Sequence, residues 1–404
     1  MEREVSLELP GSKNFKRPSE VIMDRRTPLV RVVLVLCGIL IGLLVGEVAV
    51  RVAAPQPLSA PYVEGFYGVN ATKPNIRARF FVPGAYDVTA SVNSQRFRGT
   101  KEFELLPRAG VTRIAMVGDS MTFGWGANDG DTYPAQLERI LANSVGPGRV
   151  EILNAGIGNV GTGEEAWWFD VWVKRFHPQV VVLDVFWNDV NDDFGRSFFR
   201  IDDEGGVSSR PMEELRTVSE AHQMLRHIEY ALPGFIFLDE HSHLVNLLRR
   251  VGTSVWTGAA RDSSWDGLTP DQIEKTHEAY RRTGLPLMAG EVAWLQERVQ
   301  DSGGRLVVVY LPSREEIYSP PGLRSQEVRW KSAAIAATLK ETCISRGIPF
   351  ADLTPQVRQE AAHHPGPLYY NAWADPIHAT PEGYRTFAEA VAAFLIQEGI
   401  VAKR

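Results

Sequence analysis

Apolar residues fall into one long block near the N-terminus and a series of short runs further along the chain. The long block covers residues 32–50, contains Glu47 as its single charge, and is bounded by Arg31 and Arg51. About 20 apolar residues are enough to cross a bilayer as a helix. Glu47 precedes Arg51 by four residues, so the two side chains can pair at one interface. The block therefore predicts a transmembrane helix over residues 29–52.

Charge around this block predicts its orientation. Basic residues ahead of it include Lys13, Lys16, Arg17, Arg25, Arg26 and Arg31. Few basic residues follow it closely, so the N-terminus is expected in the cytoplasm, at a bacterial-type inner (plasma) membrane, with the bulk of the chain periplasmic or extracellular. A cleaved signal peptide and a buried core helix are the alternatives. The long polar segment ahead of the block favours an uncleaved anchor over a signal peptide.

The short apolar runs predict a different architecture for the rest of the chain. They cover residues 113–117, 150–153, 180–186, 306–311 and 348–353. Turn residues bound each run, and helical patterns separate them. Such runs are typical of buried parallel strands in an α/β sheet.

The chain between and around these runs divides into segments. Residues 1–28 are polar and predict a disordered cytoplasmic tail. Residues 53–110 predict a proline-marked linker and a β-rich lead-in. Residues 111–404 predict the main domain. Residues 190–304 are far longer than one crossover requires, so we expect an insertion beside the sheet that could cap a site.

Two helices are expected inside this insertion, around residues 241–250 and 272–300. A further helix is expected to begin at Thr380 and Pro381, because a threonine N-cap followed by proline is a helix start signal.

Composition narrows the possible classes of protein. The chain has 404 residues, a formal net charge of −6, 44% hydrophobic residues and 2 Cys. These values are typical of a globular protein and exclude wholesale disorder, a disulfide scaffold and a four-thiolate zinc site. The acidic balance argues against a nucleic-acid binder. Cys37 lies in the predicted span, so it is not expected to pair with Cys343 in an exported domain.

Polar side chains follow the predicted strands, where ligands bind in open α/β sheets. Ser120 follows the first strand within Gly-Asp-Ser, and NAGIGNVGT follows the second. Asn188 follows the third strand, whereas Asp375 and His378 stand just before the last predicted helix. We therefore expect these blocks to converge.

These four blocks, in this order, resemble the SGNH/GDSL hydrolase family over roughly residues 75–400. The resemblance implies Ser120 as nucleophile, Asn188 as oxyanion donor, and Asp375 and His378 as the remaining triad residues. The apolar span, the lead-in and the long insertion are similar to the membrane-anchored, exported branch of that family. Together the pattern and the resemblance predict a flavodoxin-like three-layer α/β/α sandwich with a five-stranded parallel sheet of order 2-1-3-4-5.

Elementary chemistry supports these roles. A serine hydroxyl is a weak nucleophile unless a base takes its proton, and His378 can act as that base near neutral pH. Asp375 can orient the imidazole and stabilise its charged form. The oxyanion requires preorganised donors, for which we expect the Ser120 backbone N–H, the Asn188 amide and a second-block group. The family usually has glycine at that second-block position, whereas this chain has Asn159, which could donate from its backbone or its side chain.

Other polar and aromatic groups have structural interpretations. Asp189, Asn191, Asp192 and Asp193 predict a solvated loop rather than a metal site, and no metal or organic cofactor is implied. Trp125 and Trp187 flank the first and third blocks and are expected to line the pocket. Asn93, Phe97 and Arg98 resemble a structural N-x-x-G-F-R element, with Arg96 in place of the glycine.

The function predicted is that of a serine esterase that cleaves an O-acyl or O-acetyl ester through an acyl-enzyme. An O-acyltransferase acting on a cell-envelope polysaccharide is the first alternative. It is weakened because Ala379, not an aromatic residue, follows His378. An inactive binding or scaffold protein is the second alternative. The partners expected are an ester or acylated-glycan substrate and the membrane, but no nucleic acid.

Overall fold

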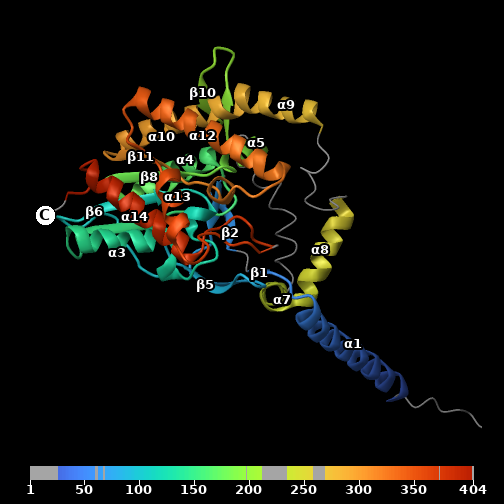
Figure 1. The fold of residues 1–404 in the computed structure, drawn as a ribbon. Coiled ribbons are helices and arrows are strands. Elements are labelled where there is room, and N and C mark those ends of the chain that lie inside the picture. The colour runs from blue at the N-terminus through green and yellow to red at the C-terminus, as the bar shows by residue number, and fades with distance from the viewer. Residues whose placement is uncertain are drawn as a thin grey trace, which may run out of the picture. The chain divides into compact units, whose positions relative to one another are not determined.

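The computed structural model describes residues 26–59, 62–66, 69–196, 198–211, 234–257, 269–372 and 374–402 (Figure 1). The predicted tail over residues 1–28 therefore lies almost wholly outside the described residues, as do parts of the predicted lead-in and insertion. By its internal contacts the chain divides into two units, Met1–Ala49 and Val50–Arg404.

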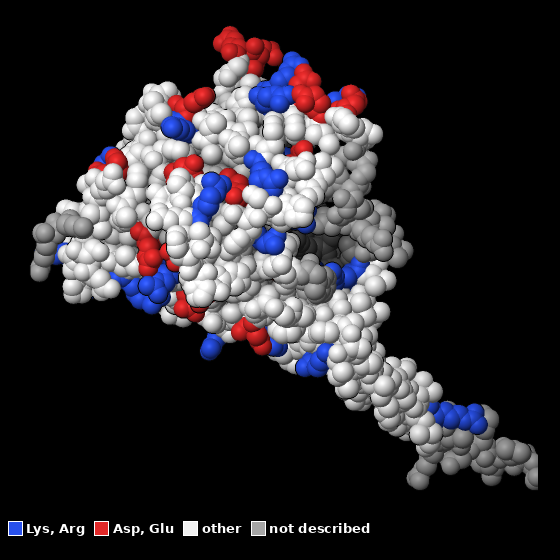
Figure 2. Space-filling model, in the orientation of Figure 1, with Lys and Arg blue, Asp and Glu red and all other residues white. Residues whose placement is uncertain are grey.

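The smaller unit contains most of helix α1 (Arg26–Ala53). Its side chains from Leu29 to Leu44 are exposed although nearly all are apolar. Figure 2 shows the visible face of α1 as uncharged along most of its length. The stretch Leu29–Ala53 is long and apolar enough to cross a membrane, a property that anchors and signal sequences share.

A parallel sheet of five strands forms the centre of the larger unit. The strands are β6 (Thr112–Val117), β7 (Val150–Asn154), β8 (Val180–Val185), β11 (Arg305–Tyr310) and β12 (Phe350–Asp352). They lie in the order β7-β6-β8-β11-β12, and every neighbouring pair is parallel. The predicted order 2-1-3-4-5 is therefore confirmed.

Helices cover both faces of this sheet and complete three layers (Figure 1). The helices on one face are α4 (Thr162–Val171), α10 (Leu285–Asp301) and α12 (Leu323–Arg346), and those on the other are α3 (Tyr133–Val145), α11 (Arg314–Tyr318), α13 (Thr354–His363) and α14 (Pro381–Gln397). Strand β8 supplies both cores, because Val181 and Leu183 pack in the first whereas Val180 and Val182 pack in the second. This alternation explains why the central strands are apolar on both faces.

The predicted lead-in forms two small antiparallel sheets. One consists of β1 (Leu58–Ser59), β4 (Ile76–Val82) and β5 (Tyr86–Val92), and the other of β2 (Val63–Phe66) and β3 (Val69–Thr72). Side chains of β4 and β5 form a core that includes Phe123, just after Ser120. The lead-in is thus packed against the first polar block.

The long segment between β8 and β11 is helical for most of its described length. Its elements are α5 (Asp189–Arg196), β9 (Phe199–Ile201), β10 (Val207–Ser209), α7 (Phe235–His241), α8 (His243–Thr257), α9 (Pro270–Ala279), a π-helical turn over Tyr280–Gly284, and α10. The helix expected over residues 272–300 thus consists of α9, the π-turn and α10. The last of these contributes Met288 and Val292 to the core of the sheet.

Candidate active site

Ser120 is the first residue of a single helical turn, α2 (Ser120–Phe123), directly after β6. Asp119 caps this turn, because its carboxylate accepts a hydrogen bond of 2.7 Å from the Met121 N–H. A Cβ atom at Gly118 would lie 2.2 Å from the Thr122 hydroxyl, so this tight strand-to-helix turn requires glycine. The turn leaves Ser120 at the carboxyl end of the sheet.

His378 and Asp375 approach Ser120 from the loop ahead of α14. The Ser120 Oγ lies 2.9 Å from His378 Nε2, and His378 Nδ1 lies 2.9 Å from each oxygen of Asp375. The Asp375 carboxylate also accepts the His378 backbone N–H at 3.1 Å. These three side chains therefore form a continuous hydrogen-bonded array.

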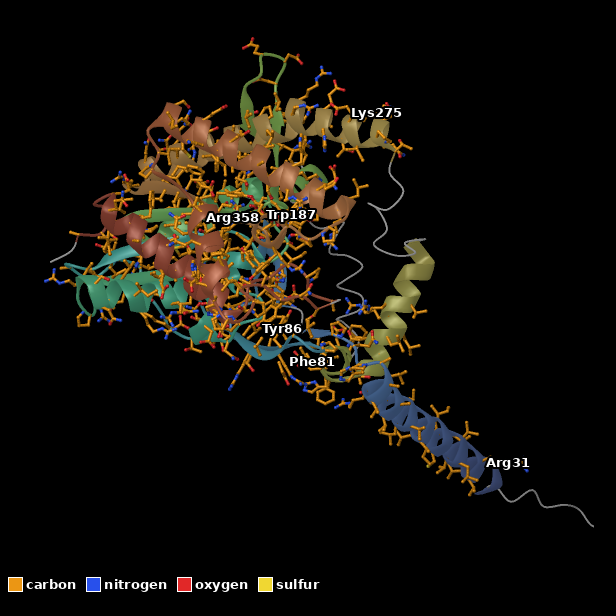
Figure 3. All side chains as sticks on the ribbon, viewed as in Figure 1. Arg31, Phe81, Tyr86, Trp187, Lys275 and Arg358 are labelled. Carbon is orange, nitrogen blue, oxygen red and sulfur yellow. The ribbon has the colours of Figure 1, made fainter. Side chains whose placement is uncertain are left out.

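Tyr86 of β5 extends this array from the lead-in. Its hydroxyl donates to Asp375 Oδ2 at 2.8 Å, and the Trp125 indole N–H donates to the same hydroxyl at 2.7 Å. The Trp125 ring also lies 5.9 Å from the His378 ring, centroid to centroid. Figure 3 labels Tyr86 on its strand. Trp125 therefore lies at the site, as expected, whereas Tyr86 was not predicted because nothing local in the sequence connects β5 with Asp375.

The surroundings of these groups favour a charged carboxylate and a neutral phenol. Burial by itself would raise the pKa of Asp375, but the His378 charge and the hydrogen bonds from His378 and Tyr86 outweigh it and lower this pKa. Burial and the Asp375 charge raise the pKa of Tyr86 far above its ordinary value. Tyr86 therefore stays protonated, and its hydroxyl donates a hydrogen bond to the Asp375 carboxylate.

The second and third blocks lie beside the first. A Cβ atom at Gly158 would lie 3.6 Å from Ser120 Cβ, which places the second block next to Ser120. Asn159 follows with a left-handed φ of 61° and an exposed side chain. The Asn188 amide donates to Asp192 at 2.7 Å, and it lies close enough to Asp119 to offset part of the rise that burial causes in the pKa of Asp119. Both residues thus surround the turn that carries Ser120, and their chemical roles remain predictions.

A cluster of buried carboxyl groups lies behind this site, which the sequence interpretation missed. Residues 189–193 are not a solvated loop, since they begin helix α5 and bury Asp189 and Asp193 almost completely. The amphipathic spacing of α5 turns these acids inward, where sequence composition alone suggested solvent. Burial raises the pKa of Asp193 to about 7 and that of Asp119 to about 6.

Further buried acids complete this cluster. Glu165, Asp184 and Glu291 are each about 1–2% exposed, and burial raises the pKa of each well above its ordinary value. Within the described ranges, no group of three or more His, Cys, Asp or Glu side chains is arranged to hold a metal ion. Burial is the main cause of these raised pKa values, and it favours the protonated forms of the acids.

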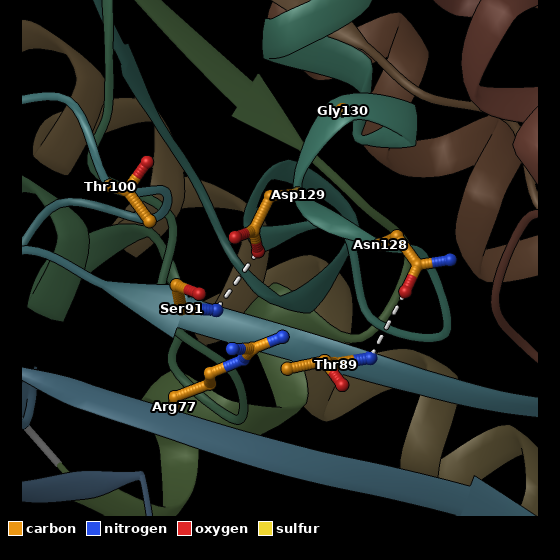
Figure 4. A pocket seen from close by; sticks show the side chains of 7 residues that line it. All are labelled: Arg77, Thr89, Ser91, Thr100, Asn128, Asp129 and Gly130. Carbon is orange, nitrogen blue, oxygen red and sulfur yellow. Dashed lines mark hydrogen bonds between the residues drawn. The ribbon is translucent and has the colours of Figure 1, made fainter.

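A separate polar pocket of about 450 Å³ lies over β5 (Figure 4). The Asn128 side-chain oxygen Oδ1 accepts the Thr89 N–H at 3.1 Å, and the Asp129 carboxylate accepts the Ser91 N–H at 2.9 Å. These side chains satisfy the free edge of β5. None of the residues of the Ser120 array lines this pocket, so it is distinct from the candidate active site.

Comparison with protein families places this chain among hydrolases. Residues 116–386 match the family model described as the GDSL-like Lipase/Acylhydrolase family. The α/β fold and this match together identify the protein as a hydrolase that cleaves esters. The chain belongs to the GDSL-like lipase/acylhydrolase family. The matched range begins after the lead-in, so the membrane-anchored branch stays a prediction.

Solved structures similar to this chain have low sequence identity to it. An aryl esterase of M. smegmatis is 13% identical, covers 72% of this chain and 100% of its own, and gives a TM-score of 0.37. A catalytic mutant of Axe2, an acetylxylan esterase from Geobacillus stearothermophilus, is 12% identical over 72% of this chain and 96% of its own, with a TM-score of 0.39. A search of curated proteins gave no match.

Proposed function

We propose that this protein is a serine esterase that cleaves short O-acyl esters, acetyl esters among them, through a Ser120-His378-Asp375 triad. The observation that carries the proposal is the array itself, with 2.9 Å between Ser120 Oγ and His378 Nε2 and 2.9 Å between His378 Nδ1 and Asp375. These are the distances at which a base can take the proton of an attacking hydroxyl.

The reaction runs in two halves. As Ser120 Oγ bonds to the ester carbonyl carbon, His378 Nε2 takes the hydroxyl proton. It then gives that proton to the leaving alkoxide, so the C–O bond breaks and an acyl-enzyme remains. Water attacks the acyl carbon while His378 takes its proton. Collapse of the second tetrahedral intermediate releases the carboxylic acid and returns the proton to Ser120. Asp375 stays ionised and orients His378 throughout.

Preorganised donors stabilise the oxyanion of both tetrahedral intermediates. We assign this role to the Ser120 backbone N–H, the Asn188 amide and the backbone N–H of Asn159. Neither backbone N–H has a hydrogen-bond acceptor among the described residues. The left-handed φ of 61° at Asn159 and its exposed side chain favour the backbone over the side-chain amide for this residue. Loss of one such donor typically costs about 10²–10³-fold in rate.

The apolar helix α1 gives the enzyme its proposed location. We assign Leu29–Ala53 as an uncleaved single-pass anchor, with the N-terminus cytoplasmic and the catalytic unit exported. Its length, its apolar composition and the basic residues ahead of it support this assignment. The substrate is then an ester on the exported side of the membrane.

Replacement of Ser120 tests the proposal directly. In Ser120→Ala, hydrolysis of a short acyl ester should fall by at least about 10⁴-fold, since the nucleophile is gone while the fold remains. Labelling by a fluorophosphonate probe should be lost as well. Ser208→Ala, at an exposed position of β10, serves as the matched control and should keep both. Unchanged hydrolysis by Ser120→Ala would refute the assignment.

A further inference from the structure

Helix α7 (Phe235–His241) is built with its apolar side chains outward. Ile236, Phe237 and Leu238 are 41%, 63% and 43% exposed, whereas Asp239 is 2% exposed. A helix on the surface of a soluble protein normally shows the reverse pattern. On the next helix, α8, Leu248 is also exposed. The arrangement indicates that α7 faces an apolar environment.

Polar contacts on the inner side hold α7 in this orientation. The buried Asp239 carboxylate pairs with Arg249 of α8 at 2.7 Å. The Asn246 amide donates to the Asp239 carbonyl oxygen at 2.8 Å. Rotation of α7 to bury its apolar side chains would break this ion pair and leave Asp239 exposed to the apolar side. The outward orientation is therefore a stable property of the fold.

The place of α7 in the larger unit indicates which environment this is. The Arg51 guanidinium donates to the His241 carbonyl oxygen at 2.8 Å, and the Gln56 backbone N–H donates to His243 Nδ1 at 2.8 Å. Phe81 of β4 also contacts the His243 ring, at 5.7 Å between centroids. Arg51 belongs to the last turn of the apolar segment Leu29–Ala53. The C-terminal end of α7 is thus hydrogen-bonded to a residue in the last turn of the apolar segment.

We propose that α7 lies in the interfacial layer of the same lipid bilayer that the anchor spans, with Ile236, Phe237 and Leu238 inserted among the lipids. This proposal rests on the membrane anchor of the proposed function. An amphipathic surface helix buries its apolar face roughly 5–10 Å into the boundary between headgroups and acyl chains. Arg51 then lies at headgroup level, where basic side chains are favourable. This second contact holds the catalytic unit against the membrane surface instead of leaving it on a free tether.

A fluorescent label at position 237 tests this placement. The full-length chain carrying Phe237→Cys and Cys37→Ser is labelled with NBD and reconstituted into phosphatidylcholine–phosphatidylglycerol vesicles. Cys343 can stay, because it is buried and its thiol pKa is raised to about 12, so it reacts slowly. Leu105→Cys in the same background is the matched control, since Leu105 is 61% exposed in the lead-in.

The label at position 237 should show blue-shifted emission. Nitroxide-labelled lipids should quench most of its fluorescence, and those with the nitroxide near the glycerol level should quench it most strongly. The label at 105 should be quenched by aqueous iodide alone. Equal iodide quenching at both positions would overturn the proposal. Blue-shifted emission at 237 that nitroxide lipids leave unchanged would also overturn it, because a protein surface would then cover α7. Leu238→Cys repeats the test if the first variant misfolds, which ester hydrolysis reports.

A label on the native Cys37 tests the membrane anchor separately from the proposed membrane contact of α7. The otherwise unaltered chain is labelled with NBD at Cys37. Nitroxides deep in the acyl region should quench the fluorescence of this label, because Cys37 lies within Leu29–Ala53. No quenching at Cys37 would overturn the anchor and the α7 contact together. Quenching at Cys37 without quenching at position 237 would overturn the α7 contact alone.

Discussion

Tyr86 couples the lead-in to the chemistry of the site through one hydroxyl group. Its hydroxyl donates to Asp375 Oδ2 and so supports the charge of that carboxylate, and the Trp125 indole N–H holds the phenol in place. A hydrogen bond to a charged group contributes about 1.5–3 kcal/mol. We therefore treat Tyr86 as a positioning residue that acts through Asp375 on His378.

Tyr86→Phe should lower kcat by about tenfold. Loss of about 1.5 kcal/mol, the lower value for a hydrogen bond to a charged group, corresponds to about that change in rate. KM should stay unchanged, since Tyr86 acts on Asp375 and not on the ester. Steady-state kinetics with a short acyl ester measure both constants. Tyr370→Phe is the control, because the Tyr370 hydroxyl donates to the Gly126 carbonyl instead. A rise in KM with constant kcat would instead assign Tyr86 to substrate binding.

Residues differ in how far the sequence could predict them. Ser120, Asp375 and His378 could be singled out because each stands in a local motif at a predicted strand or helix end. Tyr86 could not, because its partner is 289 positions away. Arg96 stands where the similar element has glycine, and the structure gives it a left-handed φ of 70°. Position 96 therefore has the left-handed backbone conformation that favours glycine, although this chain has arginine there.

At the scale of elements, the second block and the lead-in meet at one glycine. A Cβ atom at Gly158 would lie 1.9 Å from the Tyr62 hydroxyl, which precedes β2. The Tyr62 ring is itself packed between aromatic rings, with centroids 4.9 Å from Phe123 and 5.3 Å from Trp125. A side chain at position 158 must therefore displace Tyr62 and disturb the surroundings of Ser120.

Gly158→Ala should reduce ester hydrolysis by roughly tenfold or more, since misplacement by an ångström near reacting groups can cost up to ~10²-fold. The double variant with Tyr62→Phe should recover most of the loss, because the clashing hydroxyl is gone and the next atom, Tyr62 Cζ, is 3.2 Å away. Gly130→Ala, with no atom within 4 Å, is the control. Absence of any recovery in the double variant would show that the effect does not pass through Tyr62.

Elements were predictable where burial dominates their composition. The central strands β8 and β11 are runs rich in Val and Leu because both faces of the sheet are covered, and that signal is visible in the sequence. Helix α5 was missed because its acidic residues are typical of solvent, whereas tertiary packing buries Asp189 and Asp193. The outward apolar face of α7 likewise depends on contacts with α8 that no local pattern contains.

At the scale of the whole molecule, the pattern of strands and the family resemblance together predicted the order of the sheet, whereas the burial of several acidic side chains was not predicted. Asp193, Glu165 and Glu291 are buried together, so the folded state favours their protonated forms. The pKa of Asp193 rises from 3.8 to about 7, with burial as the main cause. The folded state therefore binds more protons than the unfolded state between these two values.

This difference sets the sign of the pH dependence. Stability conferred by the protonated Asp193 is complete below its ordinary pKa and is lost as the pH rises through about 7. The Tm of the wild-type protein should therefore fall between about pH 4 and pH 7 and level off above about pH 8. Asp193→Asn carries no ionisable group at this position, so its Tm should fall less over the same range. Asp301→Asn, at an exposed carboxylate of α10, should follow the wild type. Thermal unfolding followed by circular dichroism at each pH measures the difference, and equal slopes for Asp193→Asn and the wild type would show that the Asp193 proton does not stabilise the fold.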